Sequence, residues 1–302
     1  GIIFATWAED APSLEAYLGD ARWYLDTTFN RRDSGMVVYG PQKWTQPVNW
    51  KTPVDNCSDN YHTVISHYAS ALISVRFGRA RQDGLGHKAL FASPSEHVFV
   101  NGHSLTFRIL NDDQPFFGGR VKNEIVELTR EHQKAVLPEV ERRLGNFRAR
   151  KIQLSNHSTF PHGVLGFRMA HPKGPTTTEF WHFTVIEKDL PEPVRNARLA
   201  AGIYNGAAGM VEQDDIDNWA QVTASGLSPT GRKILHQVSM GSGHENQQHP
   251  EFPGSVSDRY ISENNQRHFY ARWQEFMNSK TWADIPIDPI TAKFEGTATM
   301  KG

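Results

Sequence analysis

The chain has 302 residues, of which 38% are hydrophobic and 11% aromatic, enough for one large domain with a sizeable core or for two small domains. Its formal net charge of −1 argues against a nucleic-acid partner, and no apolar run approaches the roughly 18 residues of a membrane span. The N-terminus lacks the basic and apolar segments of a secretory signal. Because Cys57 is the single cysteine, no internal disulfide can form, and we expect a cytoplasmic protein.

The first part of the chain predicts a strand, a helix and a second strand. Residues 1–7 have the pattern of a strand that starts at once, as in a chain cut from a longer parent. Pro12 and Ser13 are helix start signals ahead of apolar residues at helical spacing, so we predict a helix over 12–26. The alternating apolar residues of 35–47 predict a strand with turns.

The next predicted helix covers residues 59–76 and follows Pro53, which blocks any helix that runs back through it. Residues 79–95 contain the glycines of a loop. The dipeptide Asn101-Gly102 favours the positive φ angles of a tight turn, so residues 96–110 are predicted to form a β-hairpin around it.

The rest of the chain alternates long helices with strands. We predict an amphipathic helix over 121–144, three strands over 150–188, and a helix over 192–224 that glycines weaken at its centre. Residues 226–258 are polar and predict a surface excursion, and a last helix is expected over 259–278. Antiparallel strands with long helices, without an internal repeat or an interdomain linker, predict one α+β domain.

Two histidines, His62 and His67, stand five residues apart. Five residues rotate a regular helix by about 140°, so the two imidazoles can reach one ion only if the helix is distorted or ends there. By this spacing alone, two unrelated histidines are the commoner explanation. Asp59 lies three residues before His62, where a carboxylate can accept the second ring N–H of a ligand histidine, although a carboxylate there also suits a helix N-terminus.

A second segment has four acids in six positions, which usually marks a solvated helix face. Helical spacing divides it into a polar stripe and an apolar stripe. The polar stripe contains Asp214, Asp217 and Gln221, and the apolar stripe contains Val211, Asp215, Trp219 and Val222. A buried lone carboxylate is costly unless it is paired or bound to metal, and this singles out Asp215.

Two neutral histidines and one carboxylate form a facial triad that leaves open positions on Fe(II). The candidate ligands for such a mononuclear iron site are therefore His62, His67 and Asp215. A closed structural zinc site would need a fourth protein ligand, and the sequence offers no clear candidate.

The segments that contain these candidate ligands resemble a known family. The first segment includes Asn49-Trp50-Lys51, Asp55-Asn56, Asp59, Tyr61-His62 and His67. It resembles the iron-binding signature of Rieske non-haem iron ring-hydroxylating oxygenases, and residues 209–219 resemble the third-ligand helix of their large subunits. Further similarity lies at residues 1–7, 17–24, 41–44 and 269–277, so the resemblance covers nearly the whole chain. It points to the branch that oxidises biphenyl and polycyclic hydrocarbons.

This resemblance implies a helix-grip fold of the Bet v 1/START type, in which a curved antiparallel sheet packs on long helices. It implies that Asp59 is the bridge for electrons from a neighbouring subunit and that Asn56 lies near the iron. Asn56 and Asp59 are three residues apart, where the family has four, which implies a shorter loop at the pocket. The implied pocket-wall positions are Cys57, His157, Val164, Leu165, Phe167, Asn205 and Val211.

The implied activity is dioxygenation, in which both atoms of O2 add to an aromatic hydrocarbon as a cis-dihydrodiol. A [2Fe-2S] Rieske cluster, the electron source, needs two cysteines and two histidines, and this chain has one cysteine. We therefore expect residues 1–302 to be the catalytic iron domain of a parent whose Rieske domain precedes it. The implied partners are further copies in a homotrimer or an α3β3 assembly with a small β subunit, and a ferredoxin and a reductase as electron donors.

Three other functions remain open. A related monooxygenase or demethylase of aromatic acids often needs a cation in its pocket, and the implied pocket positions contain no Arg or Lys. A metal-free ligand-binding protein of the helix-grip type would bind no iron, and a zinc hydrolase would contain zinc.

Several other residues are read as structural. Cys57 has a simpler reading as a small, partly buried residue. Trp181 and Phe183 are predicted core positions, and His103, His244 and His249 are predicted to be solvated. The aromatic residues predicted to form core or a subunit contact are Phe269, Tyr270, Trp273 and Phe276.

Overall fold

The computed structural model describes residues 3–58, 61–70, 72, 95–109, 123–160, 163–164, 167–204, 206–207, 209–246, 249–257 and 261–297. Within these residues a nine-stranded sheet has the order β1-β7-β6-β5-β4-β3-β2-β9-β8, and every pair of neighbouring strands is antiparallel. The strands are β1 (Met36–Gln46), β2 (Ser95–Val100), β3 (His103–Ile109), β4 (Ile152–Thr159), β5 (Gly163–Val164), β6 (Phe167–Gly174), β7 (Thr177–Glu187), β8 (Glu245–Asn246) and β9 (Ser255–Ser257). The predicted α+β class is confirmed.

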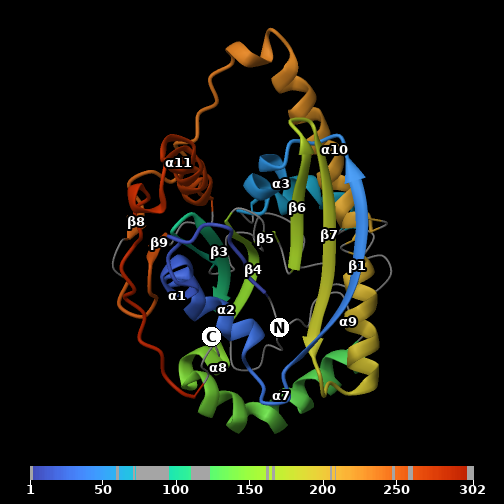
Figure 1. Ribbon diagram of the computed structural model, residues 1–302. Helices are drawn as coiled ribbons and strands as arrows, with labels where there is room; N and C mark the ends of the chain where they lie inside the picture. The colour runs from blue at the N-terminus through green and yellow to red at the C-terminus, as the bar shows by residue number, and fades with distance from the viewer. Residues whose placement is uncertain are drawn as a thin grey trace.

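Helices surround this sheet (Figure 1). They are α1 (Leu14–Leu18), α2 (Ala21–Phe29), α3 (Lys51–Asn56), α4 (Thr63–Ser66), α7 (Asn123–Leu144), α8 (Asn146–Lys151), α9 (Glu192–Tyr204), α10 (Met210–Leu227) and α11 (Asn264–Asn278), with 3-10 turns η2 (Gly231–Lys233) and η3 (Trp282–Asp284). Helices α9 and α10 run along β1 and β7, and α7 crosses the lower end of the molecule (Figure 1). None of the described helices is both long and apolar enough to cross a membrane.

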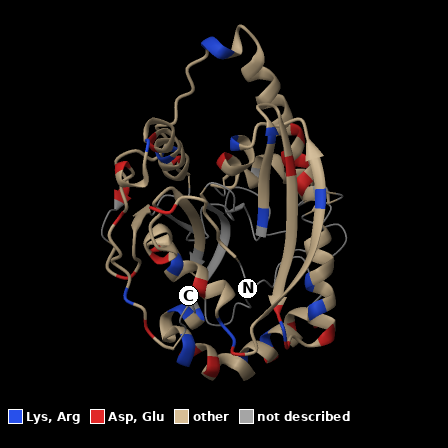
Figure 2. Cartoon of the chain, viewed as in Figure 1, with Lys and Arg blue, Asp and Glu red and all other residues tan. Residues whose placement is uncertain are grey.

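The core consists of several apolar clusters that lie between the sheet and the helices. One cluster packs α10 on the sheet through Trp219, Phe180, Ala170 and Val48, each at most 1% exposed. Another contains Phe269 of α11, as predicted, with Tyr270, Trp273 and Phe276 packed against it. Acidic and basic residues are mixed over the elements in Figure 2, as expected for a net charge near zero.

The predicted hairpin is confirmed. Strands β2 and β3 pair on either side of Asn101 and Gly102, which have φ angles of 49° and 81°. A Cβ atom on Gly102 would lie 2.3 Å from Cγ of Arg272, so both the backbone angle and the close approach of α11 require glycine there.

The structure corrects several predicted elements. Residues 3–7 form no strand. The helix predicted over 12–26 is two helices, because Gly19 adopts a φ of 52° and ends α1. Residues 150–188 contain four strands rather than three, since the short β5 lies between β4 and β6. The helix predicted over 192–224 is likewise two helices, α9 and α10, separated in its glycine-rich centre.

Pro53 does not stop a helix, contrary to prediction. It is the third residue of α3, in the first turn, where a proline removes no intrahelical hydrogen bond. The predicted helix over 59–76 is interrupted at His67: α4 ends at Ser66, and residues 68–70 and 72 are helical again. Residues 59–60, 71 and 73–76 of this prediction lie outside the described residues. The predicted loop over 79–95 lies almost entirely outside the described residues.

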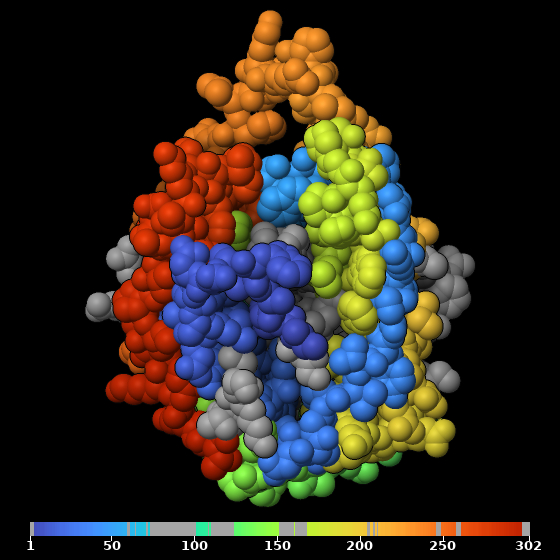
Figure 3. Space-filling model, viewed as in Figure 1, coloured from blue at the N-terminus to red at the C-terminus, as the bar shows by residue number. Residues whose placement is uncertain are grey.

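The predicted surface excursion is correct in its first half. Residues 228–237, which we call the arm, stand clear of the body between α10 and α11 (Figures 1 and 3), and Leu235 is 96% exposed. The chain rejoins the body at Val238 and Met240, whose carbonyl oxygens accept from Arg267 of α11. The second half is not an excursion. Phe252 and Val256 are buried at 2% and 1% exposure, and β9 pairs with β2.

Candidate metal centre

The histidine pair brackets a one-turn helix. His62 is the N-cap of α4 and His67 is its C-cap, with non-helical angles of φ −103° and ψ 17°. The helix therefore ends at the second histidine, which is the condition that the five-residue spacing imposed. The two imidazole centroids lie 5.5 Å apart.

Asp215 completes the cluster from the second turn of α10. Its Oδ2 lies 3.3 Å from Nε2 of His67, and its Oδ1 lies 3.9 Å from Nε2 of His62. Asp215 is 6% exposed, as the helical stripe predicted, and within the described residues its buried Oδ1 has no hydrogen-bond partner. One donor atom from each of the three residues lies within 4.8 Å of the other two.

This geometry fits a divalent metal ion. Two donors that each lie about 2.1 Å from one ion, at right angles, stand about 3 Å apart, close to the separations seen here. An unpartnered buried carboxylate oxygen is costly, and a bound cation would remove that cost. Two imidazoles and one carboxylate are a donor set that suits iron, and with three protein ligands they leave positions for other molecules.

Polar groups around the cluster contact both histidines. Asp214 places Oδ2 3.3 Å from Nδ1 of His67, on the ring edge away from Asp215. Burial alone would lower the pKa of His67, but the hydrogen bonds and charges of Asp215 and Asp214 outweigh it and raise that pKa. The Asn56 amide nitrogen lies 3.3 Å from Nε2 of His62. The sequence assigned Asp214 to the solvated stripe and so missed its contact with His67.

A buried ion pair lies beside the cluster and was also missed. Arg168 of β6 donates from Nη1 to Oε1 of Glu212 at 2.7 Å, and the two side chains are 1% and 3% exposed. Burial raises the pKa of Glu212, the charge of Asp215 adds to this rise, and Arg168 opposes it. Glu212 lies three residues before Asp215 on the same face of α10, a spacing that could have predicted its burial.

The sequence profile described as the catalytic domain of the ring-hydroxylating alpha subunit matches residues 14–279. The chain belongs to the ring-hydroxylating alpha-subunit family. It is 30% identical over 301 residues to biphenyl 2,3-dioxygenase subunit alpha of Rhodococcus jostii RHA1, a match that covers 94% of this chain and 62% of the relative. It is 31% identical over 302 residues to benzene 1,2-dioxygenase subunit alpha of Pseudomonas putida, covering 93% and 63%.

A solved structure of naphthalene 1,2-dioxygenase with indole bound in its active site has the same fold. The two superpose with a TM-score of 0.78 at 26% identity, over 92% of this chain and 63% of the other. The family resemblance in the sequence is thereby confirmed. This member of the ring-hydroxylating family spans 62–63% of the length of the relatives compared with it.

The structure describes only some of the pocket-wall positions that the family resemblance implies. Val211 is half-buried one turn before Asp215. Cys57 is 4% exposed and packs in an apolar cluster with Phe160 and Phe269, so it is more deeply buried than the partly buried residue of its simpler reading. His157, Val164 and Phe167 belong to β4, β5 and β6, where the structure describes the backbone but not these side chains. Asp59, Leu165 and Asn205 lie outside the described residues.

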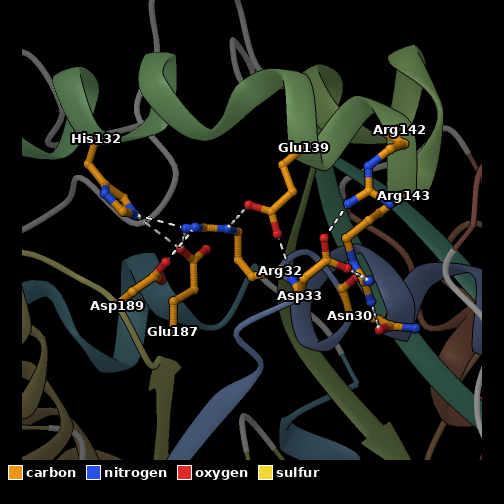
Figure 4. Close-up of polar contacts among 9 residues, drawn as sticks. All are labelled: Asn30, Arg32, Asp33, His132, Glu139, Arg142, Arg143, Glu187 and Asp189. Atoms are coloured by element: carbon orange, nitrogen blue, oxygen red, sulfur yellow. Dashed lines mark hydrogen bonds and ion pairs between the residues drawn. The ribbon is translucent and has the colours of Figure 1, made fainter.

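A second group of potential ligands in this ring-hydroxylating chain consists of His132, Glu187 and Asp189. Arg32 lies among them, as Figure 4 shows. Its guanidinium bonds Asp189 at 2.5 Å and Glu187 at 3.3 Å, and lies 3.3 Å from Nε2 of His132. Glu139 of α7 accepts from Nε of Arg32 at 2.9 Å. This cation already lies among the donors, where a metal ion would bind, so we interpret the cluster as a structural junction of α7 with the end of β7.

Some structural readings were wrong. His103 is 1% exposed rather than solvated: its Nδ1 accepts from the Phe160 N–H at 3.0 Å, and its Nε2 lies 2.8 Å from the Tyr17 carbonyl. Trp181 and Phe183 are half-buried rather than core, because β7 buries the alternate residues. His244 is exposed as predicted, whereas His249 is half-buried against Phe252.

Proposed function

We propose that this chain is the catalytic part of a terminal oxygenase component that dihydroxylates an aromatic hydrocarbon at a mononuclear iron. His62, His67 and Asp215 would hold Fe(II). The observation that supports this is the convergence of the three side chains around a buried Asp215 oxygen that lacks a hydrogen-bond partner. When bound, the iron would supply the centre at which O2 is activated with electrons from a Rieske cluster.

The residues around the cluster prepare it for that ion. A proton on Nδ1 of His67, hydrogen-bonded to Asp214, leaves the Nε2 lone pair directed toward Asp215 and His62. Asn56 offers an amide beside His62, where it would orient a polar molecule near the ion. We propose Asp59 as the bridge for incoming electrons.

The substrate class follows from the relatives. Those compared here are dioxygenases named for biphenyl, benzene and naphthalene, all neutral aromatic hydrocarbons. We propose a substrate of the same class, bound by burial of its apolar surface. The proposed pocket wall comprises Cys57, His157, Val164, Leu165, Phe167, Asn205 and Val211.

The proposed assembly follows the family. We propose that residues 1–302 form one catalytic domain of helix-grip type, and that the Rieske cluster is held outside this sequence, because one cysteine cannot bind it. Trimers, with or without a small β subunit, and a ferredoxin with its reductase would complete the system.

Metal analysis of the chain, reconstituted without oxygen, tests the proposal first. We expect one Fe(II) per chain, and loss of that iron in His62→Ala. A chain that binds no metal would contradict the proposal and support a metal-free binding protein, and a clear preference for zinc would support a hydrolase.

Product analysis tests the reaction. With a Rieske electron donor supplied and ¹⁸O2 as oxidant, benzene, biphenyl or naphthalene should yield a cis-dihydrodiol that contains two labelled atoms. A product with one labelled atom would indicate a monooxygenase instead.

A further inference from the structure

The first two turns of α10 place two buried carboxylates on one face. Glu212 and Asp215 are three residues apart, and they are 2% and 6% exposed. Their charges act on each other, and the charge of His67 also acts on Glu212. A second buried carboxylate therefore lies one helical turn before Asp215, on the helix that supplies this proposed ligand, but outside the group of donors that converge within 4.8 Å.

Arg168 holds this second carboxylate on the side of the sheet. Its bond to Glu212 is 2.7 Å long, and its guanidinium lies 5.6 Å from the centre of the Trp44 ring. Across the sheet Arg168 pairs with His182 of β7, which is neutral because burial and the charge of Arg168 lower its pKa to about 3. The guanidinium thus faces Glu212 with a neutral histidine and an indole around it.

The pairing of Arg168 with Glu212 determines how many negative charges face the proposed metal ion. Arg168 and Glu212 together carry no net charge, so Asp214 and Asp215 supply the two negative charges that balance a divalent ion. A released Glu212 would add a third negative charge and a further oxygen donor. Carboxylates are good ligands for Fe(II), and each added protein ligand fills a position that dioxygen or substrate needs.

We propose that Arg168 keeps Glu212 out of the coordination sphere of the metal and so limits the site to three protein ligands. Arg168 is then a positioning residue that acts through Glu212. This inference rests on the proposed metal centre and adds to it a reason why the ion retains open positions.

The variant Arg168→Met tests the inference in the full chain, because methionine fills most of the space without the charge. Released from its partner, Glu212 should join the ion, so we expect Fe(II) to bind about tenfold more tightly, as added ligand charge generally produces. Visible absorption of the Co(II)-loaded chain should weaken, since it falls as coordination number rises. A merely structural role for Arg168 predicts the opposite sign, which is weaker binding.

The double variant Arg168→Met/Glu212→Gln is the matched control. It removes both charges, so Fe(II) affinity should return to within about threefold of the unmodified chain and the Co(II) spectrum should recover. Weaker binding in a folded Arg168→Met chain, or tight binding that persists in the double variant, would overturn the inference.

Two further measurements keep the test decisive. If Arg168→Met does not fold, Arg168→Gln removes the charge but keeps a polar side chain, and it should shift the affinity in the same direction by a smaller factor; no shift would contradict the inference. Failure of the metal centre itself is distinguishable, because the unmodified chain would then bind no Fe(II).

Discussion

Among the described residues, two clusters bring histidine and carboxylate donors within 4.8 Å of one another, and they differ in what lies between the donors. Around His132, Glu187 and Asp189, the guanidinium of Arg32 supplies a permanent positive charge (Figure 4). Around His62, His67 and Asp215, the described residues place no such cation, and Asp215 Oδ1 is left without a hydrogen bond. Convergence of donors is therefore insufficient to indicate a metal site; the charge that the protein already supplies must be counted.

Substitution of Asp215, which contacts His67 and faces His62, should have the largest effect on metal binding. Asp215→Asn keeps the shape of the side chain but removes the charge, and we expect Fe(II) affinity to fall by more than about 100-fold, since outer-shell changes alone cost 10–100-fold. Chelator competition would measure this. Glu187→Gln is the matched control at the other cluster and should leave iron binding unchanged; equal losses in both variants would remove the distinction between the clusters.

Arg32→Met should break the second cluster. The Arg32 side chain is 6% exposed and pairs with Glu139, Glu187 and Asp189. Loss of the cation removes the ion pairs of Glu139 and Asp189 and leaves Glu187 with His132, so we expect the free energy of unfolding to fall by about 2–3 kcal/mol in urea denaturation. Zn²⁺ should then stabilise the variant more than the unmodified chain, because the donors have lost their built-in cation. No difference in the response to Zn²⁺ would argue against our reading of Arg32.

Asp214→Asn should have a smaller effect on the metal centre. The asparagine amide can still accept a hydrogen bond from Nδ1 of His67, but it carries no negative charge. Fe(II) affinity should therefore fall by about tenfold. Asp217→Asn, on the polar stripe of the same helix, serves as a control for the change in net charge. Equal effects of the two substitutions would show that Asp214 acts only through general electrostatics.

His103 should have the smallest effect on Fe(II) binding and provides a third, metal-free histidine for the comparison. Burial lowers its pKa to about 4, and the hydrogen bond to Tyr17 only partly opposes this. The folded state therefore holds His103 neutral, while the unfolded chain takes up a proton near pH 6.5. Its contribution to stability is complete above pH 6.5 and is lost as the pH falls toward 4, at about 1 kcal/mol per pH unit.

Urea denaturation of the unmodified chain and of His103→Gln between pH 7 and 4.5 would isolate this contribution. His182 and His268 have lowered pKa values too, so the difference between the two chains is the quantity to compare. Parallel pH profiles would show that His103 does not titrate on unfolding.

Features with a local signal were predictable from sequence. The turn at Asn101 and Gly102 needs two adjacent residues that tolerate positive φ, and the sequence supplies them. Burial of Asp215 followed from helical spacing with Trp219. The same stripe failed at Val222, which is 57% exposed, because the last turns of α10 extend beyond the body toward the arm (Figure 1).

Features that depend on distant partners were not predictable. His103 is buried by contacts with Tyr17 and Phe160, which lie 86 and 57 residues away in the sequence. Glu212 is buried because a strand 44 residues earlier supplies Arg168. The approach of Asp215 to His62 and His67 also depends on distant segments of the chain. Helical spacing predicted the face on which Asp215 lies, but it could not predict that this face would meet the two histidines. That expectation came from the family resemblance.

The arm offers a protease a place to attack. Residues 232–240 are all exposed, so among the described residues a protease at low concentration should cut there. A single cut would put Asp215 on one fragment and β9 with α11 on the other. Because β9 pairs with β2, the nicked protein should elute as one species while giving two bands on a denaturing gel.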